Sequence, residues 1–264
     1  MELVGFVSAI IMGLSLGLIG GGGSILTVPI LVYLFGIDPV TSTAYSLFVV
    51  GLTSLVGSFS HLKNGNVHLK TALIFGAPSI VTVYTVRKFI VPIIPDTMFS
   101  IGSFTFTKPL FVMVLFALLM LLASVSMIRD KKKAEDDTSQ IKYNYPLIFL
   151  EGILVGGVTG LVGAGGGFLI IPALVLLAGL PMKQAVGTSL LIIAMKSLIG
   201  FTGDLGSELL IDYKFMLIFS AFAIVGILGG AYLSKFISGK KLKPAFGWFV
   251  LVMGLFILGK ELLA

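Results

Sequence analysis

The chain has 264 residues, of which 57% are hydrophobic and only 11% are charged. Soluble globular domains carry about 25% charged residues, so the composition excludes a soluble domain of this size and indicates a polytopic helical membrane protein. The net charge of +6 belongs mainly to loops, so it reports topology and not nucleic-acid binding. The absence of cysteine excludes disulfides and thiolate metal sites. The expected partner is therefore a lipid bilayer and not a nucleic acid.

The chain opens on an apolar segment that ends in a run of glycines. Residues 3–19 are expected to be a retained membrane segment, because Glu2 stands where a signal peptide would carry basic residues. The run that follows consists of Gly20, Gly21, Gly22, Gly23 and Ser24. As a helix, the next apolar stretch, 24–35, would span about 18 Å, well short of the roughly 30 Å hydrocarbon core of a bilayer. We therefore predict a half-helix or a re-entrant segment here.

The remaining segments fall into two halves joined by a hydrophilic linker. The first half continues with three longer apolar segments, about 40–60, 67–90 and 107–128, with a Pro- and Phe-containing connection over 91–107. The hydrophilic stretch 129–145 separates a first membrane repeat, 1–128, from a second, 146–264. The second half is expected to span the membrane with segments at about 146–162, 167–178, 184–203, 212–236 and 244–263.

The second half repeats features of the first at a constant spacing. Its own glycine-rich run consists of Gly163, Ala164, Gly165, Gly166 and Gly167. Pro172 follows Pro29 by 143 residues, and Ser189 follows Ser46 by the same 143 residues. An internal duplication explains this spacing. Each half holds an odd number of segments, so we predict an all-α polytopic membrane protein with two inverted repeats of about five segments each, including a short broken or re-entrant half-helix after each glycine run.

The distribution of lysine and arginine predicts the orientation. If the 129–145 linker is cytoplasmic, twelve of these cations lie on the cytoplasmic face and five on the other. The five are Arg87, Lys88, Lys108, Lys214 and Lys260. Because cytoplasmic loops carry the excess of positive charge, we expect a multi-pass protein of the cytoplasmic membrane with both termini extracytoplasmic.

The two glycine runs are candidates for one anion site. A helix N-terminus presents unpaired N–H groups and a partial positive charge, and glycine lets a ligand approach the backbone closely. We expect half-helices starting near Ser24 and Gly167 to converge on a single anion. The alternative is that the glycines only allow tight helix crossing. The candidate residues from the two runs are Gly20, Gly21, Gly22, Gly23, Ser24, Gly163, Gly165, Gly166 and Gly167.

Lys196 is a cation well inside an apolar segment. Intramembrane ionisable residues are costly and usually face an aqueous cavity or a partner, so Lys196 is a candidate ligand of an anionic substrate. The alternative is a lysine bonded to helix carbonyls or to an acid. Ser189 shares its helix face, and the equivalent positions in the first half, Ser46 and Thr53, form a matching stripe. Simple helix packing is the alternative for these hydroxyl residues.

Four further residues are weaker candidates. Glu151 is either a proton carrier or an interfacial carboxylate. His61 and His68 are expected to be solvated loop residues, with proton coupling as the alternative. Tyr45 stands at the position equivalent to Thr188, and either lines the site or packs against its neighbours.

Catalysis and cofactor binding have no support in the sequence. There is no Gly-x-Ser-x-Gly nucleophile elbow and no His-Glu-x-x-His metal motif. We therefore expect neither an enzyme nor a protein with a metal or another cofactor. A passive anion channel is the alternative to a transporter, because a pore can also use glycine backbone and lysine.

The paired phrases resemble a known family. The glycine runs lead into Val28-Pro29 and Ile171-Pro172, and about fifteen residues later come Ala44-Tyr45-Ser46-Leu47 and Gly187-Thr188-Ser189-Leu190. Together these phrases resemble the sulfite exporter TauE/SafE family over essentially the whole chain. The resemblance carries the family's Gly-Thr-Ser positions onto residues 187–189, so that Thr188 joins the candidate site. The first half departs from the family pattern, with Ala44-Tyr45 where Gly-Thr is usual.

The resemblance implies a cytoplasmic-membrane permease for sulfur-containing anions such as sulfite, thiosulfate or an organosulfonate. Backbone N–H groups and one lysine also suit a small oxyanion, because charge-assisted hydrogen bonds in a desolvated site are strong. We therefore expect a secondary transporter that works by alternating access, with protons or the membrane potential as the candidate driving force. The particular anion, the direction of transport and the oligomeric state stay open at this point.

Overall fold

The computed structural model of the protein describes residues 2–101, 104–128, 145–176, 178–207, 209, 211–234 and 239–263. The first half contains α1 (Glu2–Ile19), a 3-10 helix η1 (Gly21–Leu26), α2 (Thr27–Phe35), α3 (Pro39–Lys63), α4 (Leu69–Thr85), a π-helical turn η2 (Val86–Ile90), α5 (Val91–Ile93) and α6 (Lys108–Ile128). The second half contains α7 (Tyr145–Val162), α8 (Gly167–Leu176), α9 (Met182–Thr202), α10 (Tyr213–Leu233) and α11 (Gly239–Leu263). The predicted all-α membrane class is confirmed.

The apolar surface of the helices fits a bilayer. Within the described residues, five helical stretches are long and apolar enough to cross a membrane: Pro39–Lys63, Leu69–Ile93, Lys108–Val125, Met182–Thr202 and Tyr213–Leu233. Large aliphatic side chains on the outer helices stay exposed, such as Leu122 of α6 at 68% and Val225 of α10 at 61%. An aqueous protein rarely exposes so many large apolar side chains, so this outer surface is the one that faces lipid.

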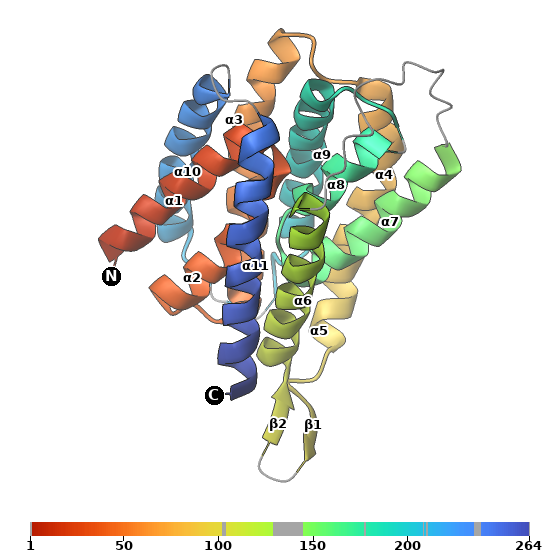
Figure 1. Ribbon diagram of the computed structural model, residues 1–264. Helices are drawn as coiled ribbons and strands as arrows, with labels where there is room; N and C mark the ends of the chain where they lie inside the picture. Colours follow the sequence, from red (N-terminus) through yellow and green to blue (C-terminus); the bar gives the residue numbers. More distant parts are fainter. Residues whose placement is uncertain are drawn as a thin grey trace.

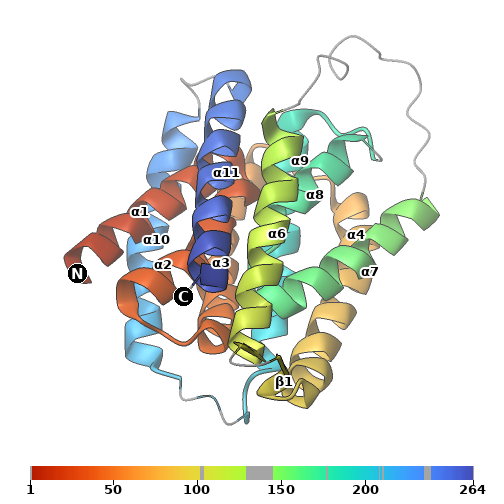
Figure 2. The ribbon, with the colours of Figure 1, turned by 60° about the horizontal axis from the view of Figure 1, so that its bottom comes forward.

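Helices α3 and α9 form the centre of the molecule, and the other long helices surround them. Both are mostly buried, whereas α4, α6 and α10 expose more than half of their apolar stretch. The surrounding pairs are reciprocal between the halves: α1 packs on α10, α7 on α4, and α6 on α11. Figures 1 and 2 both show α6 and α11 side by side. This reciprocity is what an internal duplication would give, although the inverted repeat itself stays a prediction.

Each glycine run lies at the tip of a broken helical hairpin. In Figure 1, α1 enters from one flank and α7 from the opposite flank, and both run toward the middle of the molecule. The second run ends where α8 begins, at Gly167, as predicted. In the first run the glycines are themselves helical: η1 begins at Gly21, and regular α-helix starts only at Thr27. The short helix therefore starts near Ser24 as predicted, with a 3-10 segment from Gly21 to Leu26 before the regular α-helix.

Two predicted connections have different outcomes. The 91–107 connection contains a short antiparallel hairpin, β1 (Thr97–Ile101) and β2 (Phe104–Thr107), which the apolar pattern did not predict. The predicted linker between the halves lies, for residues 129–144, outside the described residues.

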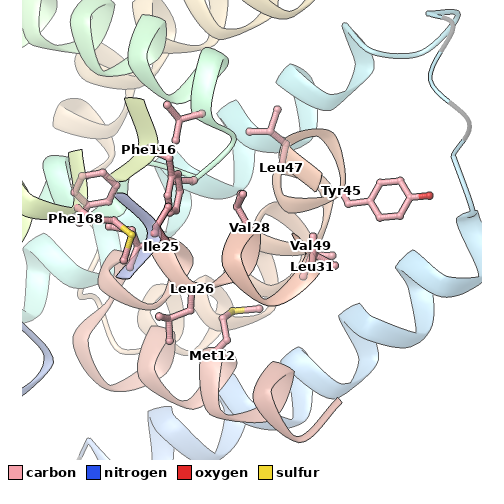
Figure 3. Close-up of a cluster of buried hydrophobic side chains, with 14 of the residues drawn as sticks. Met12, Ile25, Leu26, Val28, Leu31, Tyr45, Leu47, Val49, Phe116 and Phe168 are labelled. Atoms are coloured by element: carbon pink, nitrogen blue, oxygen red, sulfur yellow. The ribbon is translucent and has the colours of Figure 1, made fainter. Parts of the chain in front are cut away.

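The largest buried cluster joins both halves around the first broken hairpin. Figure 3 shows Phe116 of α6 and Phe168 of α8 beside Ile25 of η1. All three side chains are at least nine-tenths buried. In a bilayer the lipid is as apolar as these side chains, so their close van der Waals packing is what stabilises this junction. The cluster thereby fixes the first glycine run against the second half.

Candidate functional site

The two glycine runs meet backbone to backbone in the centre of the molecule. A Cβ atom built on Gly21 would lie 2.0 Å from the Cα of Gly167, and a Cβ on Gly167 would lie 2.0 Å from the Cα of Gly21. Gly165 lies close to Ser24 of the first run and to Val50 of α3. The predicted convergence of the runs is therefore present in the structure. Only residues without a side chain can approach this closely.

The backbone of the second run is more irregular than that of the first. Gly20 and Gly163 occupy equivalent positions and both have positive φ angles, 77° and 72°. Gly165 and Gly166 also have positive φ, at 65° and 66°. Residues with a Cβ rarely adopt this conformation. The amide groups that lead into α8 are therefore arranged as a turn, followed at once by a helix N-terminus with its unpaired N–H groups.

Lys196 lies beside this turn. Its Nζ donates a hydrogen bond of 3.0 Å to Oγ1 of Thr159, which belongs to α7. A Cβ built on Gly166 would lie 2.8 Å from Nζ and 2.1 Å from Thr159 Cγ2, so the lysine, the threonine and the glycine turn form one close group. The lysine side chain is 0% exposed. The sequence thus identified the cation, and the structure adds its partner.

The charge of Lys196 has no carboxylate partner in the described part of the chain. Three charged side chains there are buried, and two of them, Arg87 and Asp204, bind each other. Lys196 is the third. A buried cation without a counter-charge is costly, and a bound anion is the natural compensation. The arrangement is therefore suited to hold a small anion between an ammonium group and glycine backbone.

Thr53 lies at the same depth as Lys196, at the crossing of α3 and α9. Gly51 of α3 packs on Leu198 of α9, and Gly57 lies near Leu190. Residue numbers increase along α3 in the direction in which they decrease along α9, so the two helices are antiparallel here. Thr53 is fully buried, and its hydroxyl has no hydrogen-bond partner in the described part of the chain.

The structure does not bring Ser46 and Ser189 together. Each lies seven residues from the crossing, about 10 Å along its helix, and the antiparallel arrangement places them toward opposite faces of the membrane. Ser46 is buried with an unpartnered hydroxyl, while Ser189 donates to the backbone oxygen of Val186 at 2.8 Å. Ser46 lies on α3 between Thr43, which contacts Gly163, and Val50, which contacts Gly165. Ser189 lies on α9 just after Val186, which contacts Gly20, so each serine lies along a different glycine run.

Thr188 and Tyr45 perform equivalent structural tasks. The hydroxyl of Thr188 accepts a hydrogen bond of 2.9 Å from the backbone N–H of His68, the N-cap residue of α4. The hydroxyl of Tyr45 accepts from the backbone N–H of Asp212, the N-cap residue of α10. Figure 3 shows Tyr45, a member of the buried cluster, pointing away from Phe116 and Phe168. Thr188 is therefore placed at a helix start and not at the glycine runs.

Comparison with known proteins assigns the chain to a family. The family model described as sulfite exporter TauE/SafE matches residues 5–257. The chain belongs to the sulfite exporter TauE/SafE family. A probable membrane transporter protein of Xylella fastidiosa (strain Temecula1 / ATCC 700964) is 29% identical over 257 residues, covering 95% of this chain and 92% of the relative. A probable membrane transporter protein of Methanocaldococcus jannaschii is 31% identical over 269 residues, covering 97% and 93%.

A third relative, the probable membrane transporter protein YunE of Bacillus subtilis (strain 168), is 32% identical over 219 residues, covering 74% of this chain and 76% of the relative. No solved structure matches. These relatives are named as transporters and not as enzymes, so the predicted class is confirmed: this TauE/SafE protein is a multi-pass membrane transporter.

The other glycines of the candidate site of this TauE/SafE transporter have packing neighbours. Gly20 lies against Ile171 and Val186, and Gly22 is buried in η1. Gly23 packs on Leu16 near the end of α1, and Gly163 packs on Thr43 of α3. Ser24 donates to the backbone oxygen of Gly21 at 2.7 Å. Close packing therefore accounts for these glycines, as the alternative interpretation of the runs predicts.

The weaker candidates lie away from Lys196. His61 and His68 are not solvated loop residues as expected: His61 is in the last turn of α3 beside Gly187, and the ring Nδ1 of His68 accepts from the N–H of Thr71 at the start of α4. Helix capping explains the second placement. Glu151 is half-buried in α7, with Oε2 unpartnered in the described part of the chain.

A cavity of about 450 Å³ lies outside the Lys196 group, lined by Phe6, Phe35, Ile37, Tyr45, Asp212, Lys214, Phe215 and Ile218. It contains no residue of either glycine run. Two features of the site were missed from sequence: Thr159, and the buried pair of Arg87 with Asp204. Thr159 sits four residues before Gly163, on the helical turn leading into the glycine run, a spacing that could have drawn attention to it.

Proposed function

We propose that this TauE/SafE protein is a secondary transporter that moves a small sulfur-containing anion, such as sulfite, thiosulfate or an organosulfonate, across the cytoplasmic membrane by alternating access. The observation that carries the proposal is Lys196: a fully buried lysine whose Nζ bonds Thr159, beside the turn at Gly166, with no carboxylate partner in the described part of the chain. A bound oxyanion would supply the missing counter-charge.

The anion is held, in this proposal, by three kinds of group. Lys196 supplies the charge, and the backbone N–H groups of residues 165–167 supply directed donors. Thr53 supplies a hydroxyl that makes no hydrogen bond within the described part of the chain. Ser46 and Ser189 line the two access paths on opposite sides of this level. An oxyanion with several acceptor oxygens can use all of these donors at once.

The proposed orientation follows the charge distribution. The 129–145 linker is cytoplasmic and both termini are extracytoplasmic, because this arrangement puts twelve basic residues on the cytoplasmic face and five on the other. The membrane potential acts directly on an anionic cargo, and a proton gradient drives transport when protons move together with the anion or in exchange for it.

Anion flux in proteoliposomes tests the function. Saturable uptake of labelled sulfite, thiosulfate or an organosulfonate, accumulating against its own gradient when a pH gradient is imposed, is the expected result. Saturable flux without accumulation would instead identify a passive channel. No flux of any of these anions, from protein that is monodisperse and folded, would overturn the proposal.

The role of Lys196 is tested by Lys196→Met, with Lys88→Met as the matched control. Lys88 is exposed and bonds only the hydroxyl of Tyr84 in its own helix. Hydrogen bonds to charged groups contribute about 1.5 to 3 kcal/mol, so Lys196→Met should weaken anion binding about 10- to 150-fold. Binding is measured by the thermal shift that each anion produces in purified protein, with chloride and phosphate as comparison anions. Equal affinity in Lys196→Met and the native chain would remove Lys196 from the site.

A further inference from the structure

A second buried charged group lies two turns from Lys196. The Arg87 and Asp204 side chains are 1% and 3% exposed, and they form an ion pair. Arg87 Nε donates to both carboxylate oxygens of Asp204, at 2.9 and 2.8 Å, and Nη2 lies 2.8 Å from Oδ2. This is a close, multiply bonded pair, although the sequence suggested only a basic residue near one membrane face.

The pair ties four elements from both halves together. Arg87 belongs to η2 at the end of α4, and Asp204 follows the end of α9. Arg87 Nη1 also donates to Thr43 Oγ1 of α3 at 2.8 Å and to the backbone oxygen of Gly160 of α7 at 3.3 Å. Gly203 packs directly on the Cβ of Arg87. Any separation of these helices at this level must therefore break the Arg87 contacts.

The pair lies between the Lys196 group and one membrane face. Gly160, which binds Arg87, is the direct neighbour of Thr159, which binds Lys196. Asp204, just after the end of α9, follows Lys196 by eight residues, which corresponds to about 12 Å along a helix. The residues after Asp204, from Leu205 to Ser207, are exposed. An anion leaving Lys196 toward this face would have to pass the pair.

Within the described residues, the opposite face carries no equivalent buried ion pair. At the spacing of 143 residues Asp204 corresponds to His61, and the phrase Arg87-Lys88-Phe89-Ile90 corresponds, at a slightly longer spacing, to Ser234-Lys235-Phe236-Ile237. His61 Nδ1 has no partner in the described part of the chain. The contact at that face is the neutral hydrogen bond from the N–H of His68 to Thr188. The two faces on either side of the Lys196 group therefore differ in chemistry, with an ion pair on one and a neutral hydrogen bond on the other.

We propose that the Arg87–Asp204 pair is the closing gate on its face of the transporter, and that it separates when the path from Lys196 opens to that face. This inference rests on the proposed function, in that it takes Lys196 as the anion site. An ion pair suits a gate, because both charges regain hydration when water enters the opened path, whereas an apolar plug would not. Thr43 and Gly160 hold the arginine in place while the gate is shut.

Thiol labelling tests the gate without any substrate. The chain has no cysteine, so Thr159→Cys introduces a single thiol beside Lys196. A membrane-impermeant methanethiosulfonate reagent is applied to sealed vesicles from one face at a time. In this background, Asp204→Asn should raise labelling from the Arg87 face about tenfold or more, and leave labelling from the opposite face unchanged.

Two further variants separate a gate from general loosening. Thr43→Ala removes one ligand of Arg87 and keeps the ion pair, so it gives a milder opening of about two- to threefold even if Asp204→Asn folds poorly. Arg87→Asp combined with Asp204→Arg should bring labelling back toward the starting rate. Lys88→Gln, one residue from Arg87 but exposed, is the matched control and should change nothing.

Unchanged labelling from the Arg87 face in both Asp204→Asn and Thr43→Ala would overturn the gate, and so would an equal rise from both faces. The result is distinct from that of the flux assay. Face-specific labelling without any sulfur-anion flux would retain the gate and reject the proposed cargo, while flux without face-specific labelling would do the reverse.

Discussion

The two glycine runs share a scaffold but differ in the chemistry beside them. Gly23 of the first run packs on the backbone of α1 at Leu16, and Gly166 of the second packs on Thr159 in the equivalent position. Lys196 adds a buried charge where the first half has Thr53. Each half thus has a broken hairpin, but a fully buried lysine accompanies only one of them in the described part of the chain. In the proposed transporter, such a site has one cationic flank and one neutral flank.

The contact between the runs gives the largest expected effect. Gly21→Ala or Gly167→Ala forces a Cβ to 2.0 Å from a backbone Cα, so we expect a loss of about 3 kcal/mol or more in the free energy of unfolding, or failure to fold. Gly229→Ala in α10, where a Cβ meets nothing within 4 Å, should instead gain about 0.5 to 1 kcal/mol. Thermal unfolding of the purified variants measures both. Similar melting temperatures for all three would show that the runs do not need this approach.

Replacing one threonine by valine in each half, Thr159 in the second and Thr53 in the first, tests how the two halves differ in anion binding and in stability. Thr159→Val removes the acceptor of Lys196 Nζ, so it should weaken anion binding about fivefold and also lower stability by about 1 kcal/mol. Thr53→Val removes a hydroxyl without a protein partner, so it should weaken binding by a similar factor with no loss of stability. Thermal shifts with and without the anion give both quantities. If Thr53→Val binds the anion as tightly as the native chain, the first half contributes only backbone.

The smallest expected effect concerns the equivalent hydroxyls of Thr188 and Tyr45. Thr188→Val removes the hydroxyl that accepts from the backbone N–H of His68, the N-cap residue of α4. Tyr45→Phe removes the hydroxyl that accepts from the backbone N–H of Asp212, the N-cap residue of α10. Each should cost about 1 kcal/mol of stability and leave anion affinity unchanged. Melting temperatures and anion titrations check this pair. A loss of affinity confined to Thr188→Val would return Thr188 to the binding site.

Much of the fold could be predicted because its pattern is local. Apolar segments, the hydrophilic stretch and the glycine runs are read directly from composition, and most helix bounds fall within a few residues of the prediction. The 3-10 form of the first half-helix was not predicted: Gly21, Gly22 and Gly23 are conformationally permissive, and they form a 3-10 helix that continues into the buried cluster at Ile25. The β hairpin was missed because its short strands lie in a segment whose prolines and phenylalanines fit a loop equally well.

The candidate site was only partly predictable. Lys196 is conspicuous because a lysine in an apolar segment is costly wherever its helix packs. Its partner Thr159 is not, because a threonine in an apolar helix usually bonds its own backbone, as this one also does. Arg87 and Asp204 each stand near the end of an apolar segment, and they are 117 positions apart in the sequence. Neither position by itself therefore indicates that the two side chains lie 2.8 Å apart.

The sequence by itself determined that this is a helical membrane protein with two glycine-rich breaks and a lysine inside an apolar segment, because hydropathy, helix breaking and the cost of a buried charge are properties of short segments. Only the tertiary structure decided that Gly21 touches Gly167, that Lys196 meets Thr159, that Ser46 and Ser189 diverge, and that Arg87 pairs with Asp204. Helix periodicity fixes which residues share a face, but not which helix that face meets or in which direction the two run.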